Sequence, residues 1–228
     1  THLETNLNYA FNNFIDVASG ISYRNLSTVQ RNPFSSRLSA DNNIKSLFTS
    51  LFIKSKMGFQ AEIGGRFNDH SEYGSNFTYT LNPSYLIADR YKVYANLSSA
   101  YRVPSLYQLF SEYGNLSLSP ETSRTYEAGF DLNFTPQINL SLSYFKRDIE
   151  NVIDFGQVSP GKFGYINQNK QNDKGYEVEL SYKPNGLLNL NAFYAYVDGE
   201  VTTPAGTSFN LFRRPKNSFG LNAGLDLS

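Results

Sequence analysis

The sequence predicts an all-β chain, an antiparallel meander of about eleven strands forming part of a large transmembrane β-barrel. First, 15% of the 228 residues are aromatic, with 17 Tyr and 18 Phe but no Trp, a composition that suits half-buried pleated surfaces. Second, apolar and polar residues alternate over segments of about ten residues, the length of a tilted transmembrane strand. Third, short and long connections alternate along the chain, as in outer-membrane barrels.

The composition excludes several other classes of protein. The mean hydropathy is -0.42, and no segment approaches the roughly 18 consecutive apolar residues of a transmembrane helix, so a helical membrane protein is excluded. Twenty basic residues balance 20 acidic ones, so nucleic-acid binding is not expected. The chain has no cysteine and therefore no disulfide framework.

The alternation is clearest in segment 59–67, where Phe59, Ile63 and Phe67 share one face, and Glu62 and Arg66 share the other. Segment 44–54 matches least well because its apolar residues occur on both faces, and it is predicted from its length and its neighbours. Several segments end in aromatic residues, as the girdle of a barrel at the membrane interface requires. In chain order, the predicted strands are 3–11, 16–24, 44–54, 59–67, 77–85, 93–101, 126–134, 140–144, 176–182, 190–196 and 219–227.

This register assigns residues to two surfaces of the barrel. The lipid-facing, convex surface is predicted to hold Phe59, Ile63, Phe67, Tyr126, Phe130, Phe134, Val178 and Leu180. The concave surface is predicted to hold Glu62, Arg66, Glu127, Asp131, Glu177 and Glu179.

The predicted connections fall into two sets that alternate along the chain. The short ones lie near 12–13, 55–57, 88–90, 135–137 and 184–187, and the long ones are 25–43, 69–75, 103–122, 150–174 and 199–217. Eleven strands would leave two open edges, which lipid does not tolerate. We therefore expect residues 1–228 to be a fragment of one outer-membrane β-barrel domain that needs further strands.

The most specific motifs surround the third long connection. Residues 101–110 read Tyr-Arg-Val-Pro-Ser-Leu-Tyr-Gln-Leu-Phe, residues 113–121 read Tyr-Gly-Asn-Leu-Ser-Leu-Ser-Pro-Glu, and residues 125–130 read Thr-Tyr-Glu-Ala-Gly-Phe. Together they resemble the aromatic-Arg-x-Pro strand end, the following loop and the Tyr-Glu-x-Gly strand of TonB-dependent receptors. Weaker similarities are Gly-Tyr-Glu-Val-Glu-Leu at 175–180 and Arg-Arg-Pro at 213–215.

The resemblance implies the C-terminal part of the barrel of such a receptor, without its plug domain, early strands or last strands. It implies location in the outer membrane of a Gram-negative bacterium and uptake of a scarce nutrient, cobalamin or a ferric siderophore. The implied partners are the nutrient, outer-membrane lipid and, through the missing plug, the TonB complex. No enzymatic activity, cofactor, catalytic residue or metal ligand is expected.

Two other functions remain as alternatives. A general or fatty-acid porin would share the alternation but would lack the Arg-x-Pro and Pro-Glu motifs. A barrel enzyme would need a general base, and the only histidines are His2 at the terminus and His70 in a predicted loop.

Site residues follow from the loops and from the polar face. Loops 102–119 and 154–169 are predicted to be mobile and to reach a ligand, and deletion of 155–167 is expected to weaken binding without affecting assembly. The inward-facing charges either solvate the lumen and pair with the plug, or contact the ligand. The predicted ligand-binding residues are Tyr107, Tyr113, Asn115, Tyr165 and Asn167. The predicted lumen-facing or plug-facing residues are Arg102, Glu127, Glu177 and Glu179.

Overall fold

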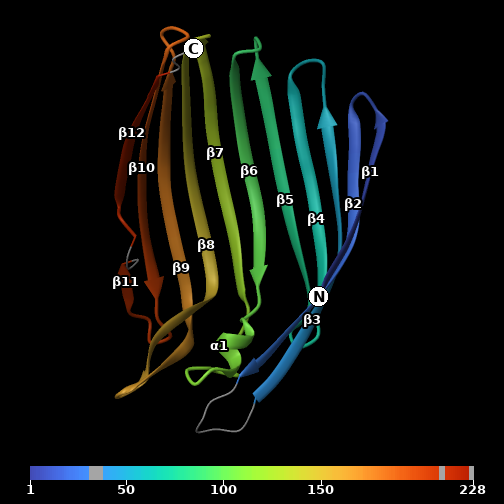
Figure 1. The fold of residues 1–228 in the computed structure, drawn as a ribbon, viewed down its shortest axis with the longest axis vertical. Helices are drawn as coiled ribbons and strands as arrows, with labels where there is room; N and C mark the ends of the chain where they lie inside the picture. Colours follow the sequence, from blue (N-terminus) through green and yellow to red (C-terminus); the bar gives the residue numbers. More distant parts are fainter. Residues whose placement is uncertain (31–37, 211–213, 226–228) are drawn as a thin grey trace.

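The computed structural model describes residues 1–30, 38–210 and 214–225, which form one antiparallel sheet (Figure 1). From β1 to β10 each strand pairs with the next, and the free edge of β10 pairs with both β11 and β12. The predicted all-β meander is confirmed, with twelve strands in the described part of the chain. The strands are β1 (His2–Asn12), β2 (Ile15–Gln30), β3 (Leu38–Lys54), β4 (Phe59–His70), β5 (Gly74–Ile87), β6 (Tyr91–Arg102), β7 (Glu121–Thr135), β8 (Ile138–Ser159), β9 (Lys162–Tyr182), β10 (Leu188–Thr202), β11 (Ser208–Asn210) and β12 (Asn217–Leu225).

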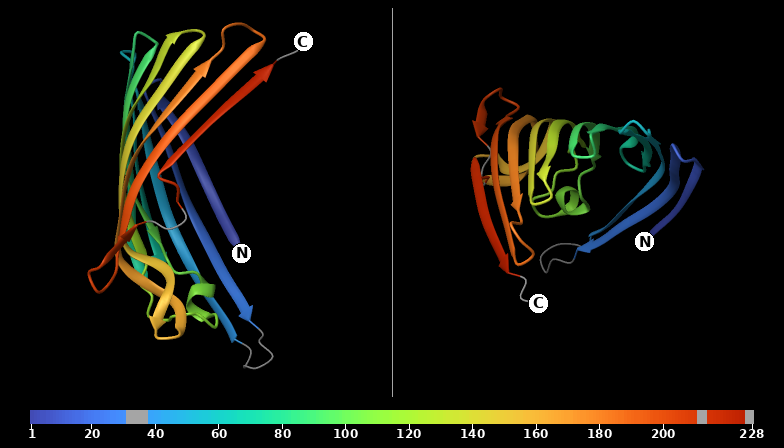
Figure 2. Two further views of the ribbon diagram at one scale, coloured as in Figure 1. Left: turned by 90° about the vertical axis from the view of Figure 1, so that its left-hand side faces the viewer. Right: turned by 90° about the horizontal axis from the view of Figure 1, so that it is seen from above.

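The sheet curves into an open arch, and the short helix α1 (Leu106–Phe110) lies on its concave side (Figure 2). One end of the arch, the short-turn end, carries the turns at 13–14, 55–58, 88–90, 136–137 and 183–187. The opposite, long-loop end carries α1 and the tip of the β8–β9 hairpin. No helix among the described residues is long and apolar enough to cross a membrane.

Cross-strand pairing confirms the predicted separation of apolar and polar faces. Ile63 lies opposite Leu51 and Leu81 and is 48% exposed. On the concave face, Glu62 accepts hydrogen bonds from the Ser50 hydroxyl at 3.1 Å and the Asn82 amide at 3.0 Å. Polar side chains therefore satisfy one another on the inside of the arch, while apolar ones stand on the outside.

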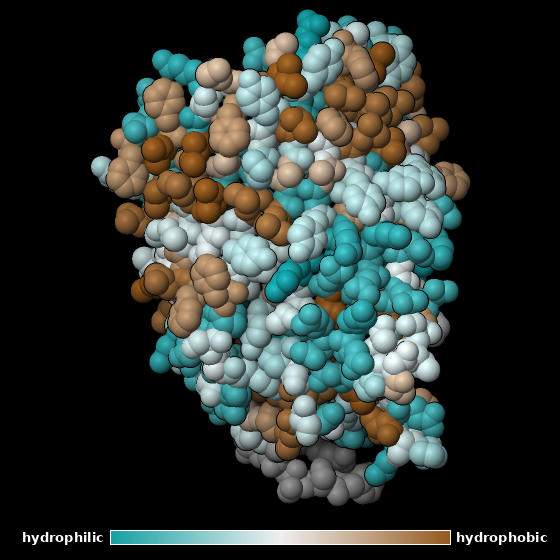
Figure 3. All heavy atoms as spheres, turned by 180° about the vertical axis from the view of Figure 1, so that it is seen from behind, coloured by the Kyte–Doolittle hydropathy of each residue, from teal (hydrophilic) through white to brown (hydrophobic). Residues whose placement is uncertain are grey.

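The convex face carries an apolar band with a sharp edge on β8, β9 and β10. Tyr144, Tyr176 and Tyr196 lie side by side in register, and the next outward positions are Lys146, Lys174 and Asp198. Figure 3 shows the convex face, with apolar side chains in the half nearer the short turns and polar ones beyond them. On β7 the band runs from residue 134 to 126, about 27 Å along the strand, or about 20 Å once the usual barrel tilt is included. This height suits the apolar band of a transmembrane barrel.

Aromatic rings on the concave face cover glycines of the neighbouring strand. A Cβ atom at Gly129 would lie 2.5 Å from Cζ of Tyr94, the residue directly opposite it, so the ring occupies the space of the missing side chain. Such pairs let adjacent strands approach closely while the ring covers the exposed glycine backbone. Among the residues that the structure describes, the pairs of this kind are Phe48–Gly20, Tyr94–Gly129, Phe145–Gly175 and Phe193–Gly220.

The strands are longer than predicted at the long-loop end. β8 has 22 residues and β9 has 21, so most of the predicted loop 150–174 is a paired hairpin. Predicted loops 25–43 and 199–217 are likewise shortened by the extension of β2, β3 and β10, and by β11, which was not predicted. Predicted loop 69–75 contracts to a turn at 71–73, so the alternation of short and long connections is not strict. In the outer part of β8 and β9, apolar residues such as Ile153, Phe155 and Tyr165 pack against α1 and against one another instead of alternating along a lipid-facing surface, although backbone pairing continues.

Candidate ligand-binding end of the sheet

A capped helical turn orders the segment that follows β6. Pro104, which is buried, has no N–H for the ladder and ends the strand. The Ser105 hydroxyl accepts a hydrogen bond from the Gln108 backbone N–H, and the Gln108 side chain accepts one from the Ser105 N–H. This capping box starts α1 and places Leu106 and Leu109 toward the protein interior.

The end of the β8–β9 hairpin packs against this segment. Leu118, which is 2% exposed, forms a small core with Leu109 and Ile153, and Phe110 and Tyr165 pack at its edge. The core joins the two regions predicted as separate ligand-reaching loops. We call α1, residues 111–120 and residues 151–169 the α1–hairpin cluster.

Two of the predicted ligand-binding residues use their amide groups within this cluster. Asn167 donates to the backbone carbonyls of Ser119 and Asn151 at 3.0 and 2.6 Å, and accepts from the Ser119 N–H at 2.8 Å. Asn115 donates to the Tyr165 carbonyl at 3.1 Å and accepts from the Ser117 N–H at 2.9 Å. Their hydrogen-bonding capacity is therefore largely engaged inside the protein, which favours a positioning role.

Arg102 lies at the end of β6, where the α1–hairpin cluster meets the sheet. Its guanidinium forms a two-pronged ion pair with Glu121, the residue opposite it at the start of β7. Hydrogen bonding to Glu121 raises the pKa of Arg102, and Glu121 also accepts from the backbone N–H of Ile153 at 2.6 Å. The Arg102–Glu121 pair thus ties β6 and β7 to the hairpin.

The cluster carries four exposed aromatic rings and the partly buried ring of Tyr165, which together we call the aromatic patch: Tyr107, Tyr113, Phe155, Phe163 and Tyr165. The Phe155 ring centroid lies 5.5 Å from that of Tyr113 and 5.3 Å from that of Tyr165. Tyr107, Tyr113, Phe155 and Phe163 are between 41% and 56% exposed. The structure thus brings together the three predicted tyrosines and adds Phe155 and Phe163, which were not among the predicted ligand-binding residues.

A cavity of about 850 Å³, open on one side, lies against the concave wall beneath α1. Arg24, Arg66 and Arg102 line it, together with His70 and Asn68. Arg66 is held by hydrogen bonds to Ser22 at 2.8 Å and to Asn68 at 2.9 Å. Of the charged side chains that line the cavity, only Glu4 is acidic, and Arg102 is already paired with Glu121, so Arg24 and Arg66 are the cations through which the cavity favours anionic groups.

The other residues predicted to face the lumen or plug lie on the concave face of the sheet. Glu127 lies opposite Asn96 and Phe145, and Glu177 lines a hollow with Arg147 and Arg214. Glu179 shares this face with Glu177, two residues along β9.

Sequence reasoning missed the central charged group of this wall, Asp173. Its side chain is fully buried and forms ion pairs with Arg147 and Arg214. Arg214 belongs to the Arg-Arg-Pro motif, whose first residue, Arg213, lies outside the described residues.

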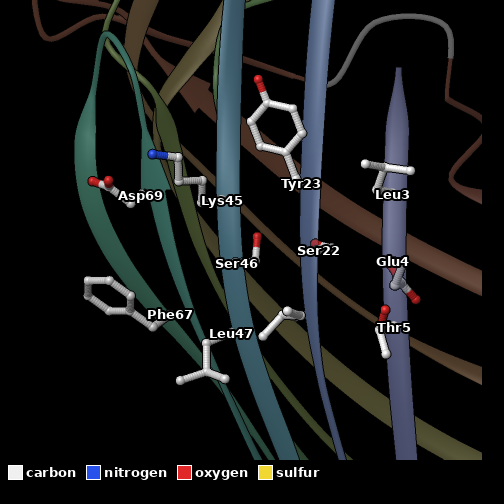
Figure 4. A pocket seen from close by; sticks show the side chains of 11 residues that line it. Leu3, Glu4, Thr5, Ser22, Tyr23, Lys45, Ser46, Leu47, Phe67 and Asp69 are labelled. Atoms are coloured by element: carbon white, nitrogen blue, oxygen red, sulfur yellow. The ribbon is translucent and has the colours of Figure 1, made fainter.

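A hollow of about 530 Å³ on the convex face is a poor candidate for a nutrient site. Its walls come from β1 to β4, and apolar side chains such as Leu3, Leu47 and Phe67 dominate them (Figure 4). This surface faces lipid in a membrane barrel. Among the described residues no group of three or more His, Cys, Asp or Glu side chains could hold a metal ion.

The fold and its surfaces define the wall of a transmembrane β-barrel. A sequence model of the family described as TonB dependent receptor-like, beta-barrel, matches residues 1–227. The chain therefore belongs to this family, whose members are receptors of the Gram-negative outer membrane.

Solved structures agree on the fold. The chain is similar to the siderophore receptor PirA from Pseudomonas aeruginosa (23% identity, TM-score 0.76, 100% of this chain and 48% of that chain) and to PirA from Acinetobacter baumannii (18%, 0.80, 100% and 40%). It is also similar to the copper transporter OprC (14%, 0.78, 98% and 41%). The chain spans less than half the length of these proteins.

Proposed function

We propose that this chain is the wall and part of the ligand-capturing end of an outer-membrane receptor that imports a ferric siderophore. The observation that carries the proposal is the aromatic patch, which the α1–hairpin cluster holds at the long-loop end. Aromatic faces bind large amphipathic ligands, and the arginine-lined cavity beneath suits an anionic chelate. Two of the similar structures are siderophore receptors by their names.

In this proposal the barrel binds the ligand, and transport also requires a plug domain and the TonB complex, neither of which is part of these 228 residues. Arg102 and the three lumenal glutamates Glu127, Glu177 and Glu179 face the space that a plug would occupy. A general porin is disfavoured by family membership, and so is a barrel enzyme, because the family consists of receptors. Cobalamin is the competing ligand, which the experiment below separates from a siderophore.

The experiment measures equilibrium binding of radiolabelled ferric siderophores and cobalamin to cells that carry the intact receptor. The double variant Tyr113→Ala/Phe155→Ala is expected to bind a ferric siderophore at least about tenfold more weakly, roughly 1.4 kcal/mol, because two rings of the patch are lost. Phe134→Ala is the control, because Phe134 is as exposed as Phe155, at 47%, but lies at the short-turn end.

Point variants replace the deletion of 155–167 that the sequence suggested. That deletion would remove Tyr165 and Asn167, which hold residues 113–119 in place, and would therefore perturb both halves of the cluster. Unchanged siderophore affinity in the double variant, at equal surface expression, would exclude the aromatic patch from the site. Binding of cobalamin alone would refute the siderophore assignment.

A further inference from the structure

We propose that the cavity beneath α1 binds a carboxylate group at the periphery of the ligand, and that the imported iron chelate is therefore of the carboxylate class. This inference rests on the proposed function and deepens it, because it names the class of siderophore. The three groups that carry it are Arg24, Arg66 and His70, which line the cavity from β2 and β4. None of them belongs to the aromatic patch.

The register of the sheet gathers these three groups at one place on the concave wall. Arg24 and His70 lie in the same cross-strand row with one strand between them, so their Cα atoms are about 10 Å apart. Arg66 lies farther along β4, but its guanidinium reaches the next row, where it donates to Ser22 at 2.8 Å and to Asn68 at 2.9 Å. Long side chains from these positions can therefore meet on one anionic group.

The two guanidinium groups supply the charge. Arg66 also lies over the ring of Phe48, with Cζ 5.1 Å from the ring centroid, and its hydrogen bonds use Nε and Nη2, so Nη1 is left for a ligand. Among the residues that the structure describes, no ion pair engages Arg24 or Arg66. Glu4, the acidic residue of the lining, lies 3.5 Å from His2.

His70 supplies a donor without a charge. The residue is 3% exposed, and its Nδ1 accepts from the N–H groups of Glu72 at 3.1 Å and Tyr73 at 3.4 Å. Burial lowers the pKa of His70, so the imidazole is neutral at pH 7 and carries its proton on Nε2. A neutral donor attracts little at a distance and acts on an acceptor in contact with it.

This set of donors selects among iron chelates. In a tricatecholate or trihydroxamate complex the charged oxygens surround the metal, and the arginines alone would suffice to attract a negative complex. A chelate with a carboxylate beyond those that bind iron offers two outer oxygens, which can accept from Arg66, Arg24 and the Nε2–H of His70 together. A peripheral carboxylate is therefore the group that uses all three residues.

The test measures equilibrium binding of radioactive iron chelates to the purified intact receptor in an uncharged detergent. The probes are the ferric complexes of citrate, of a tricatecholate and of a trihydroxamate. Wild type is expected to bind the citrate complex at least about threefold more tightly than the other two. Arg24→Gln/Arg66→Gln should weaken that binding at least about tenfold, whereas Arg90→Gln/Lys183→Gln, which removes two cations at the short-turn end, should change it less than about twofold.

Two substitutions of His70 separate contact with the ligand from support of the turn that follows β4. In His70→Asn the amide oxygen can replace Nδ1 as the acceptor from Glu72 and Tyr73, but the Nε2 donor is lost, so binding of the citrate complex should weaken at least about fivefold. In His70→Gln the amide nitrogen can replace the Nε2 donor, but the Nδ1 acceptor is lost. Binding should then be at least about threefold tighter than in His70→Asn, while amide exchange at 72–73 rises.

The inference is overturned if His70→Asn binds the citrate complex as wild type does, or if both substitutions of His70 weaken binding equally. Equal or tighter binding of the tricatecholate or trihydroxamate complex by wild type would also overturn it, while leaving the proposed siderophore receptor intact. Weaker binding in Tyr113→Ala/Phe155→Ala but not in Arg24→Gln/Arg66→Gln would restrict the site to the aromatic patch, with the same result. Binding of no ferric chelate would overturn the proposed function together with this inference.

Discussion

Replacement of Asp173 should weaken the sheet. Its carboxylate accepts hydrogen bonds from Arg147 on β8, from Arg214 at 3.0 Å and from the Gln171 side chain at 3.2 Å. It thereby connects the middle of the wall to the segment between β11 and β12. Asp173→Asn keeps the shape of the side chain but removes the charge that two guanidinium groups share.

The expected loss of stability depends on how deeply Asp173 and its two arginine partners are buried. Removing one partner of a buried ion pair costs about 3–5 kcal/mol, because the other charge stays buried without compensation. The side chain of Asp173 is 0% exposed, whereas those of Arg147 and Arg214 are 34% and 43% exposed. Water can therefore solvate both arginines in part, and we expect a loss of about 2 kcal/mol in the free energy of unfolding.

The assay is urea unfolding of the intact receptor in detergent, monitored by far-UV circular dichroism, which reports the loss of the sheet. Asp16→Asn is the matched control, because its ion pair with Lys54, at 2.6 Å, lies at the exposed short-turn end and should contribute about 0–1 kcal/mol. Adding Arg214→Gln to Asp173→Asn should restore part of the loss, since one uncompensated charge disappears. A change below about 0.5 kcal/mol in Asp173→Asn would refute the argument from burial.

Three further predictions concern the cluster, the inner wall and pH. Asn167→Ala should speed amide hydrogen exchange in residues 111–119 at least about tenfold in exchange mass spectrometry, with unchanged global unfolding. Gly129→Leu should cost about 1–3 kcal/mol in urea unfolding because Tyr94 fills its space, whereas Gly186→Leu, with nothing within 4 Å, should not. Burial lowers the pKa of His70, beyond the apolar band, and its Nδ1 accepts from the Glu72 and Tyr73 N–H groups. This stabilisation is complete above the unfolded pKa of about 6.5 and is lost as pH falls through the lower folded pKa, so exchange at 72–73 should rise, with no such pH step in His70→Gln.

The sequence predicts the strands well only where one face of a strand meets lipid and the other meets polar groups. In β4 and β7, lipid on one side and polar contacts on the other enforce a period of two, which Ile63 and Glu62 display directly. Residues 162–174 of β9 contain no such contrast, because neither face lies in the apolar band and their few apolar residues, such as Phe163 and Tyr165, pack on the α1–hairpin cluster. Their pairing with β8 depends on backbone hydrogen bonds, which leave little trace in side-chain pattern.

The candidate site was predictable in residue type but not in arrangement. Tyrosines in two loops suggested a binding surface, yet the pairing of Phe155 with Tyr165 depends on the register of a hairpin that was not predicted. The amide of Asn167 could bind a ligand or hold two loops together, and the sequence does not distinguish these roles. Its hydrogen bonds to the backbone of Ser119 show that it connects the loops. Asp173 sits in the polar run between Asn172 and Lys174, so nothing local distinguishes it from a solvated residue.

The continuity of β8 and β9 beyond the membrane has a consequence for ligand capture. A free loop that closes on a ligand loses conformational entropy on binding, about 0.5–1.5 kcal/mol for each side chain that becomes fixed. Here Phe155 and Phe163 stand on a paired hairpin, and Tyr165 packs on the core that includes Leu118. Their rings are therefore largely in position before a ligand binds. As a result, less of the favourable energy of the ring contacts is needed to offset the entropy lost when side chains become fixed. Loosening the cluster without touching a ring, as Asn167→Ala does, should then weaken binding mainly through this entropic term.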